Sequence, residues 1–300
     1  MNRRSYSTLD AEALAARVAQ AEAALRDCHL CGNDCGLDRT AGAGPCGIGA
    51  RVYVASYGPH HGEEAPLRGW RGSGTIFFSG CNLHCVYCQN ADISQQVVGE
   101  PVTAERLAAI MLALQEMGCH NVNLVSPTHV AAHLVPAMAL AIRGGLRIPF
   151  VYNTGGYDAP QALALMAGLV DIYMPDMKYA DPDVGARYSG VADYPAVNRA
   201  AVREMHRQVG DLALDAQGIA QRGLLVRHLV LPEGLAGTAE IARFLAEEIS
   251  PETYVNVMGQ YRPAYRARAY PPLDRRVTPE EVREAEAVVR VAGLHRLDQC

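Results

Sequence analysis

The 300-residue sequence has no run of about 20 apolar residues, the length that a helix needs to cross a membrane. It contains a single Trp, and its first residues lack the apolar core of a secretory signal peptide. Its formal net charge of −5 gives no general attraction to nucleic acid or to an anionic membrane. We therefore expect a cytoplasmic protein, with neither a membrane nor nucleic acid as its partner.

Cysteine, in contrast, is plentiful: nine are present, and seven of them fall in two short segments. Disulfides concentrate in small secreted domains, whereas tight groups of cysteine in an intracellular chain are typical of metal sites. Of the two cysteines outside these groups, Cys119 is expected to be a small buried hydrophobic residue, and Cys300 is given no role. With 49% apolar residues, the chain can bury a large core as one domain or as a domain with an appendage.

The second cysteine group consists of Cys81, Cys85 and Cys88, spaced C-x3-C-x2-C with no fourth cysteine nearby. Structural zinc sites and electron-transfer clusters normally take four protein ligands. A 4Fe-4S cluster held by three thiolates keeps one iron open to a substrate or cofactor. The alternative is a zinc or redox site whose remaining ligand lies elsewhere.

The first cysteine group consists of Cys28, Cys31, Cys35 and Cys46, which supply four thiolates. Six glycines between residues 32 and 49 allow the tight turns that bring sulfur atoms together. Zinc and an auxiliary 4Fe-4S cluster both satisfy four thiolates. Four structural cysteines without a metal are the alternative.

Periodicity divides the chain into an arm and a repeating part. Apolar residues at helical spacing predict an amphipathic helix over about residues 9–27, and residues 52–74 are interpreted as a loop-rich connector. Six strand–helix units follow. The expected strands are 75–79, 121–125, 149–153, 171–175, 223–231 and 254–258, and the expected helices are 103–117 with Thr103 as N-cap, 129–142, 160–169, 183–209, 238–249 and 279–292.

Alternating strands and helices require crossover connections and a parallel sheet, so the fold class is α/β. Periodicity alone leaves an open doubly wound sheet and a barrel as alternatives. We expect two parts: residues 1–74 as a helical, cysteine-rich metal-binding extension, and residues 75–300 as the α/β part.

The three-cysteine spacing, with Tyr87 before the last cysteine, resembles the signature of radical S-adenosylmethionine (SAM) enzymes. Residues 76–90, 171–178 and 226–232 resemble the corresponding stretches of pyruvate formate-lyase activating enzymes. The cysteine-rich N-terminus is similar to that of an activating-enzyme-like branch whose substrate is not established.

This resemblance implies a partial (β/α)6 barrel that binds a 4Fe-4S cluster and SAM. Such an enzyme cleaves SAM reductively to a 5′-deoxyadenosyl radical, which abstracts hydrogen from a substrate. The substrate would be a protein, a glycyl-radical enzyme among the options, or a small molecule. The electron donor would be a protein such as flavodoxin or ferredoxin.

Loops at the carboxyl ends of parallel barrel strands build ligand sites. Asp176 and Lys178 stand two apart at such an end, on the same side of an extended segment. The resemblance implies that they lie along SAM and that Asn153 makes a polar contact with it. A salt-bridged strand end and a turn residue, respectively, are the alternatives.

Arg227 and His228 interrupt an apolar strand, and adjacent strand residues point to opposite faces. The resemblance selects Arg227 to pair with the SAM carboxylate, and His228 is expected to be a core histidine bonded to backbone. Gln260 and Tyr261 end the sixth strand, where relatives place polar site residues. No catalytic residue is assigned.

Residues 126–129 stand where many radical SAM enzymes carry Gly-Gly-Glu, and Thr128 is expected to be a helix N-cap there. We expect residues 1–74 to cover the open side of the barrel near SAM. The competing functions are a non-catalytic iron–sulfur electron carrier or sensor and, more remotely, a zinc-ribbon binding module with an inert barrel.

Overall fold

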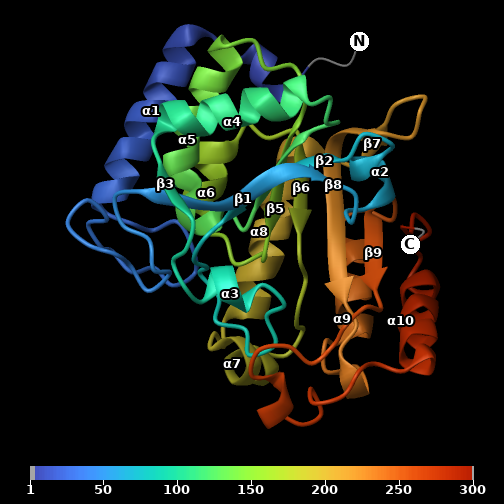
Figure 1. Ribbon diagram of the computed structural model, residues 1–300. Helices are drawn as coiled ribbons and strands as arrows, with labels where there is room; N and C mark the ends of the chain where they lie inside the picture. The colour runs from blue at the N-terminus through green and yellow to red at the C-terminus, as the bar shows by residue number, and fades with distance from the viewer. Residues whose placement is uncertain (1–3, 299–300) are drawn as a thin grey trace.

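The computed structural model describes residues 4–298 and has a sheet at its centre (Figure 1). Within these residues nine strands form the sheet in the order β3-β1-β2-β4-β5-β6-β8-β7, with β9 beside β8. Six strands are mutually parallel. They are β2 (Ser73–Phe78), β4 (Val122–Val125), β5 (Phe150–Thr154), β6 (Ile172–Pro175), β8 (Ala220–Leu229) and β9 (Tyr254–Met258).

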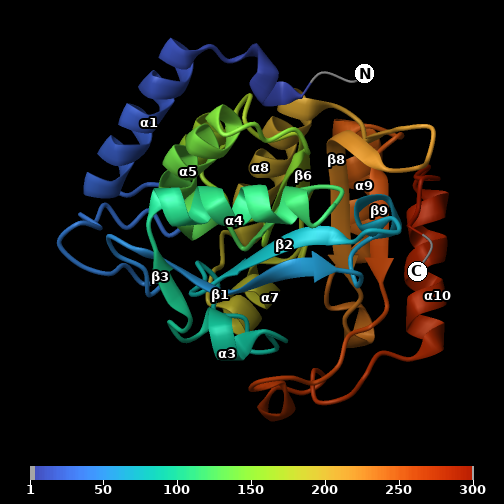
Figure 2. The ribbon, with the colours of Figure 1, turned by 45° about the horizontal axis from the view of Figure 1, so that its top comes forward.

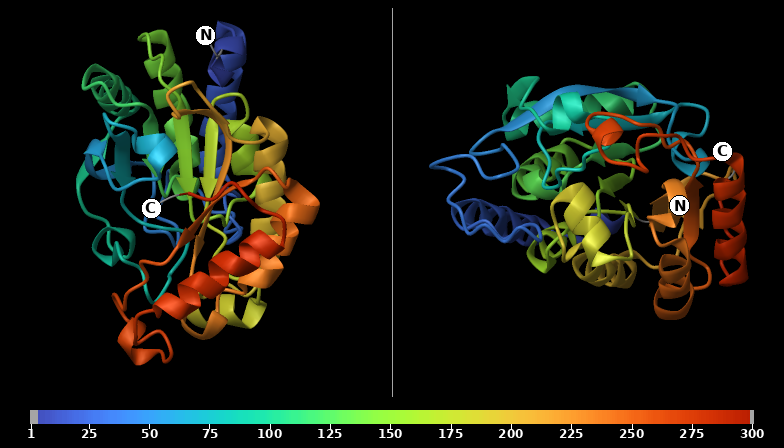
Figure 3. Two further views of the ribbon diagram at one scale, coloured as in Figure 1. Left: turned by 90° about the vertical axis from the view of Figure 1, so that its right-hand side faces the viewer. Right: turned by 90° about the horizontal axis from the view of Figure 1, so that it is seen from below.

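These six strands confirm the six expected units. Seen from below, the sheet curves from β2 round to β8 and β9, as a partial barrel requires (Figure 3). The expected helices are present as α4 (Ala104–Glu116), α5 (Ala131–Arg143), α6 (Pro160–Met166), α7 (Pro182–Ser189), α8 (Tyr194–Val209), α9 (Thr238–Phe244) and α10 (Pro279–Val291). Thr103 caps α4 as expected, because its side chain accepts a hydrogen bond from the backbone N–H of Arg106.

Strand register decides which side chains face the inside of the curved sheet. Thr75 pairs with Asn123, Asn123 with Val151, and Asp176 with Arg227. These paired residues face the inside of the curved sheet. Because successive strand residues point to opposite faces, the residues next to them in each strand face outward and form the main core with the helices. Ile76, Leu124, Tyr152 and Tyr173 belong to this outer core.

The prediction of a loop-rich connector at residues 52–74 is wrong. Strand β1 (Val52–His60) pairs antiparallel with β2 and with β3 (Glu100–Val102), and the short helix α2 (Ala65–Arg68) follows. Gly58 and Pro59 obscure the strand pattern. Since β3 pairs only with residues 52–54, the side of β1 that faces away from β2 has no partner strand at Pro59, which a proline tolerates. The short strands β3 and β7 (Ala213–Leu214) were also not predicted.

The N-terminal helix α1 (Ala11–Arg26) forms as predicted, with Asp10 as its N-cap. Leu14 and Ala21 are buried on its inner face. The helix packs against α5 and α6, outside the barrel and far from β9 (Figure 2). The expectation that the whole arm covers the open side of the barrel is therefore wrong for α1, because the apolar face of α1 packs against α5 instead.

Two other segments close the barrel. Leu67 of α2 packs inside the barrel near the amino ends of the strands, with Val151, Ile172 and Leu225. At the opposite end, the chain after β9 crosses beneath the strands toward the cysteine loop (Figure 1), where the N–H of Arg266 donates to the carbonyl of Val86 at 2.8 Å. This C-terminal segment, residues 259–278, was not predicted to have any such role.

Across residues 4–298, none of the helices has both the length and the apolar character that crossing a membrane would take.

Candidate functional site at the carboxyl ends of the strands

Cys81, Cys85 and Cys88 lie on the loop between β2 and the short helix α3 (Ala91–Ser94). Gly80 opens this loop with φ +78°, and a Cβ there would lie 2.3 Å from the carbonyl oxygen of Cys46, so only glycine fits. Burial raises the pKa of Cys81 to about 12, and the neighbouring Cys85 and Cys88 add to the effect. The three thiols therefore lie close to one another in a water-poor setting.

Hydrogen-bond donors surround these sulfur atoms. Ser189, at the end of α7, donates to Sγ of Cys85 at 2.9 Å. Burial raises the pKa of Cys85, but the Lys178 ammonium and this hydroxyl both oppose the rise. The hydroxyl of Ser94 lies 3.1 Å from Sγ of Cys88. Such donors favour the thiolate, which is the form that binds metal.

A tyrosine chain extends from Ser189 into the protein. The hydroxyl of Tyr179 lies 2.7 Å from that of Ser189 and 2.7 Å from that of Tyr87. Burial raises the pKa of both tyrosines well above the usual value, so both stay protonated. The aromatic residue before the last cysteine thus belongs to a hydrogen-bonded chain that ends at the cysteine sulfur.

Asp176 joins the two predicted cations. Its Oδ2 accepts from Nζ of Lys178 at 2.6 Å, and its Oδ1 accepts from Nε of Arg227 at 3.0 Å. Burial by itself would raise the pKa of Asp176, but the two cations outweigh it and hold that pKa below its usual value. The structure therefore brings together three of the predicted site residues as one ionised group.

Two acidic residues at this site were missed by the sequence analysis. Glu63 and Glu64 lie before α2, with carboxylate oxygens 3.9 and 4.0 Å from nitrogens of Arg227. Asn256 of β9 donates to Glu64 at 2.9 Å. Burial raises the pKa of Glu63 to about 7, against the opposing effect of Arg227. In the sequence, two adjacent glutamates in an expected loop are typical of solvent-exposed residues. The folded connection between β1 and α2 instead places both side chains inside the barrel.

The structure places the other residues singled out in the sequence in different environments. Asn153 is buried at the end of β5, and its carbonyl accepts from the N–H of Ser126 at 2.8 Å. His228 is a core histidine as expected, since its Nδ1 donates to the carbonyl of Met177 at 2.9 Å. Gln260 is exposed, and Tyr261 is buried and donates to the carbonyl of Leu273.

The loop after β4 connects the neighbouring strands. Ser126 adopts φ 55°, and the hydroxyl of Thr128 lies 2.8 Å from that of Thr154. Thr128 is not a helix N-cap, because that position is held by Pro127 and the Thr128 side chain is used by Thr154 instead. His129 donates from Nε2 to the carbonyl of Ser79, two residues before Cys81, at 2.8 Å.

The N-terminal cysteine segment, residues 28–46, lies against the same end of the barrel. Cys31 forms a β-bridge with Asp158, and the side chain of Asn33 donates to the carbonyl of Asn82 at 2.8 Å. Burial is the main cause of the raised pKa of Cys31, and Cys46 and Cys28 contribute to it. The segment that carries the first cysteine group therefore packs directly against the loops at the end of the barrel that carries the second group.

The cysteines of both groups are free thiols. Among residues 4–298, no three His, Cys, Asp or Glu side chains are already arranged around a single metal ion. In an iron–sulfur cluster each cysteine binds a different iron atom, so its ligands need not converge on one point. The donor set at Cys81, Cys85 and Cys88 fits such a group, with Lys178 and Ser189 beside it.

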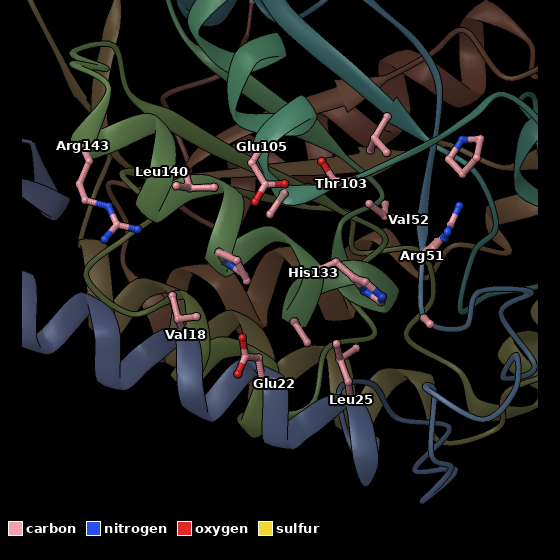
Figure 4. Close-up of a pocket in the computed structure, with 16 residues that line it drawn as sticks. Val18, Glu22, Leu25, Arg51, Val52, Thr103, Glu105, His133, Leu140 and Arg143 are labelled. Atoms are coloured by element: carbon pink, nitrogen blue, oxygen red, sulfur yellow. The ribbon is translucent and has the colours of Figure 1, made fainter.

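A groove of about 520 Å³ lies elsewhere, between α1, α5 and the start of β1 (Figure 4). Val18, Leu25 and Leu140 point into it, together with His133. It contains none of the cysteines or of the charged residues around Arg227, so we do not assign the site to it.

Comparison with known proteins agrees with the geometry. The model of the radical SAM superfamily matches residues 75–215. The uncharacterized protein MJ0674 of Methanocaldococcus jannaschii is 32% identical over 292 residues, which cover 94% of this chain and 79% of that protein. Residues 75–215 therefore belong to the radical SAM superfamily, whose members typically use a 4Fe-4S cluster and SAM.

The comparison with solved structures includes two of SuiB from Streptococcus suis. The structure bound to S-adenosylmethionine gives a TM-score of 0.47 at 10% identity, and a second SuiB structure gives 0.49 at 12% identity. Each match covers 73% of this chain. The chain spans a little under half of SuiB, 47% and 46% in the two cases.

Proposed function

We propose that this protein is a radical SAM enzyme of the activating-enzyme-like type. The observation that carries the proposal is the position of Asp176, Lys178 and Arg227, which form a buried ionised group beside the three-cysteine loop. A simple electron carrier has no use for two buried cations at the mouth of a barrel, which makes the non-catalytic iron–sulfur alternative less suited to this site.

Cys81, Cys85 and Cys88 would hold the cluster, and Arg227 with Lys178 would bind the carboxylate or ribose of SAM. When bound and reduced, the 4Fe-4S cluster would supply the single electron for reductive cleavage of SAM, and with it the radical chemistry that removes hydrogen from a substrate. Asp176 keeps both cations charged and oriented. The C-terminal segment, residues 259–278, and the tyrosine chain exclude water from the cysteine loop.

The substrate proposed from the resemblance is a protein, with a glycyl-radical enzyme as one option, or a small molecule. A reduced flavodoxin or ferredoxin would supply the electron, and a reducing compartment such as the cytoplasm would keep the thiols available for metal. The four N-terminal cysteines would bind a second metal, zinc or an auxiliary 4Fe-4S cluster.

The test is anaerobic reconstitution with iron and sulfide, reduction with dithionite, and measurement of 5′-deoxyadenosine and methionine formed from SAM. We expect both products from the wild type and neither from a Cys81→Ala, Cys85→Ala, Cys88→Ala variant. A wild type that carries the cluster but neither binds nor cleaves SAM would favour the electron-carrier alternative.

A further inference from the structure

Arg39 is a buried cation without a carboxylate partner among residues 4–298. Its side chain lies in the N-terminal cysteine segment and is only 2% exposed. Nη1 donates to Sγ of Cys28 at 3.3 Å, and Nη2 donates to the carbonyl of His129 at 3.2 Å. Nε is buried with no acceptor.

Such an arrangement is costly unless negative charge lies nearby. A guanidinium stays charged in proteins, and an uncompensated buried ion costs several kcal/mol. His129 and His133 also face Arg39, but burial lowers the pKa of each to about 4, so both are neutral. The group that contacts Arg39 directly and can become negative is the thiol of Cys28.

Two thiols, Cys28 and Cys46, lie beside the guanidinium. A Cβ on Gly44 would lie 3.4 Å from Nη1 of Arg39 and 3.6 Å from Sγ of Cys46, so both groups flank the same point. Cys28 is close enough to Cys35 for each to affect the other electrostatically, and Cys31 is close to Cys28 and Cys46 in the same way.

As neutral thiols these four residues leave Arg39 uncompensated. Metal binding changes this, because it replaces the thiol protons. Four thiolates around Zn²⁺, or around a 4Fe-4S core of charge 2+, leave two negative charges at the place where Arg39 is buried.

We propose that Arg39 is the counter-ion of a dianionic tetrathiolate metal centre at Cys28, Cys31, Cys35 and Cys46. Through its second hydrogen bond, Arg39 also ties this centre to the loop after β4 at His129. That loop is bonded to Ser79, just before the loop that carries Cys81, Cys85 and Cys88, so occupancy of the N-terminal centre orders this end of the barrel. The inference does not depend on the proposed radical chemistry.

The test compares Arg39→Met, Arg39→Lys and the control Arg17→Met in the full chain, each with and without the Cys81, Cys85, Cys88 alanine changes. Arg17 is a fair control because it also donates to backbone carbonyls, those of Ala164, Leu165 and Ala167. Each protein is loaded with Zn²⁺ or, separately, with iron and sulfide under anaerobic conditions. Native mass spectrometry and metal analysis then identify which metal stays bound during chelator competition.

We expect Arg39→Met to weaken metal retention about 10- to 100-fold, as loss of an outer-shell partner does, and to lower the thermal midpoint. Arg17→Met should lower the midpoint without changing metal retention. If the thiols bind no metal, Arg39→Met removes an unpaired charge and should leave stability unchanged or raise it. That result, or metal retention equal to the wild type, would overturn the proposal.

Arg39→Lys separates charge from geometry, and it also serves if the Met variant does not fold. It should keep most of the metal but lose hydrogen-exchange protection at residues 126–130. In the wild type, removing the metal should lower protection at the same residues. If Arg39→Lys loses metal as readily as Arg39→Met, charge compensation is not its role; unchanged protection in metal-free wild type would overturn the link to the β4 loop.

Discussion

Nε of Arg227 donates to Oδ1 of Asp176 across 3.0 Å, between two adjacent parallel strands and 51 positions apart in sequence. The same carboxylate holds Lys178, so one acidic residue sets the orientation of both cations. The two cations face the carboxyl ends of the strands, where the cysteine loop lies. This arrangement is the basis of the first prediction.

Arg227→Ala should weaken SAM binding about 10- to 100-fold while the cluster loads normally, because it removes a charge-assisted hydrogen bond of roughly 1.5–3 kcal/mol. Binding is measured by equilibrium dialysis of labelled SAM against the reconstituted protein. Arg222→Ala, on the exposed part of the same strand, is the control and should bind normally. Equal SAM affinity in both variants would remove Arg227 from the SAM site.

Ser189→Ala should lower the reduction potential of the cluster, because a hydrogen bond to a cysteine sulfur stabilises the more negative reduced state. We expect roughly a tenfold fall in the ratio of reduced to oxidised cluster at a fixed potential, about 59 mV for one electron. Tyr179→Phe should shift the potential less and in the same direction, since it weakens the chain one bond further away.

Electron paramagnetic resonance during a redox titration measures both shifts. Tyr261→Phe is the matched control, since Tyr261 packs against Tyr87 but donates to the carbonyl of Leu273. A potential unchanged in Ser189→Ala would show that its hydroxyl does not reach the ligand sulfur in the loaded protein.

The buried Glu63 should make stability depend on pH. Its pKa is raised from 4.5 to about 7, so between these values the native protein holds a proton that the unfolded chain has lost. Stability should therefore fall as pH rises from about 4.5 to about 7 and change little above that, a difference of about 3 kcal/mol at most. Glu63→Gln should flatten this part of the profile in thermal unfolding, and the exposed Glu116→Gln should not. A wild-type profile that rises over this range would contradict the prediction.

Truncation should distinguish the arm from the barrel. A chain starting at Arg51 keeps β1 and the β1–α2 connection and should fold with lower stability, because α1 no longer covers α5. A chain starting at Arg71 loses β1, Leu67 and both glutamates of the site, and should be insoluble. Circular dichroism and size-exclusion chromatography of the two proteins check this. If the shorter chain folded as well as the longer one, the barrel would not need β1.

Much of the fold was predictable because it depends on local sequence patterns. The six strands and the helices between them follow from apolar runs and helical periodicity, and Thr103 could be identified as a cap from its place before α4. The connector at residues 52–74 could not, since Pro59 and Gly58 break the strand pattern and only pairing with β2 restores it. The C-terminal segment, residues 259–278, has no periodicity that would indicate where it packs.

The sequence by itself determined that three thiols lie on one loop, because Cys81, Cys85 and Cys88 fall within eight consecutive residues. It also determined that Arg227 and His228 face opposite sides, because that follows from strand geometry alone. Tertiary structure decided the partners of these groups: Ser189 at Cys85, Glu63 near Arg227, and Arg39 between a thiol and the β4 loop. Each of these contacts joins two segments that are distant in the sequence. Their chemistry depends on burial, because a buried arginine or glutamate needs an oppositely charged or hydrogen-bonding partner that an exposed one does not need.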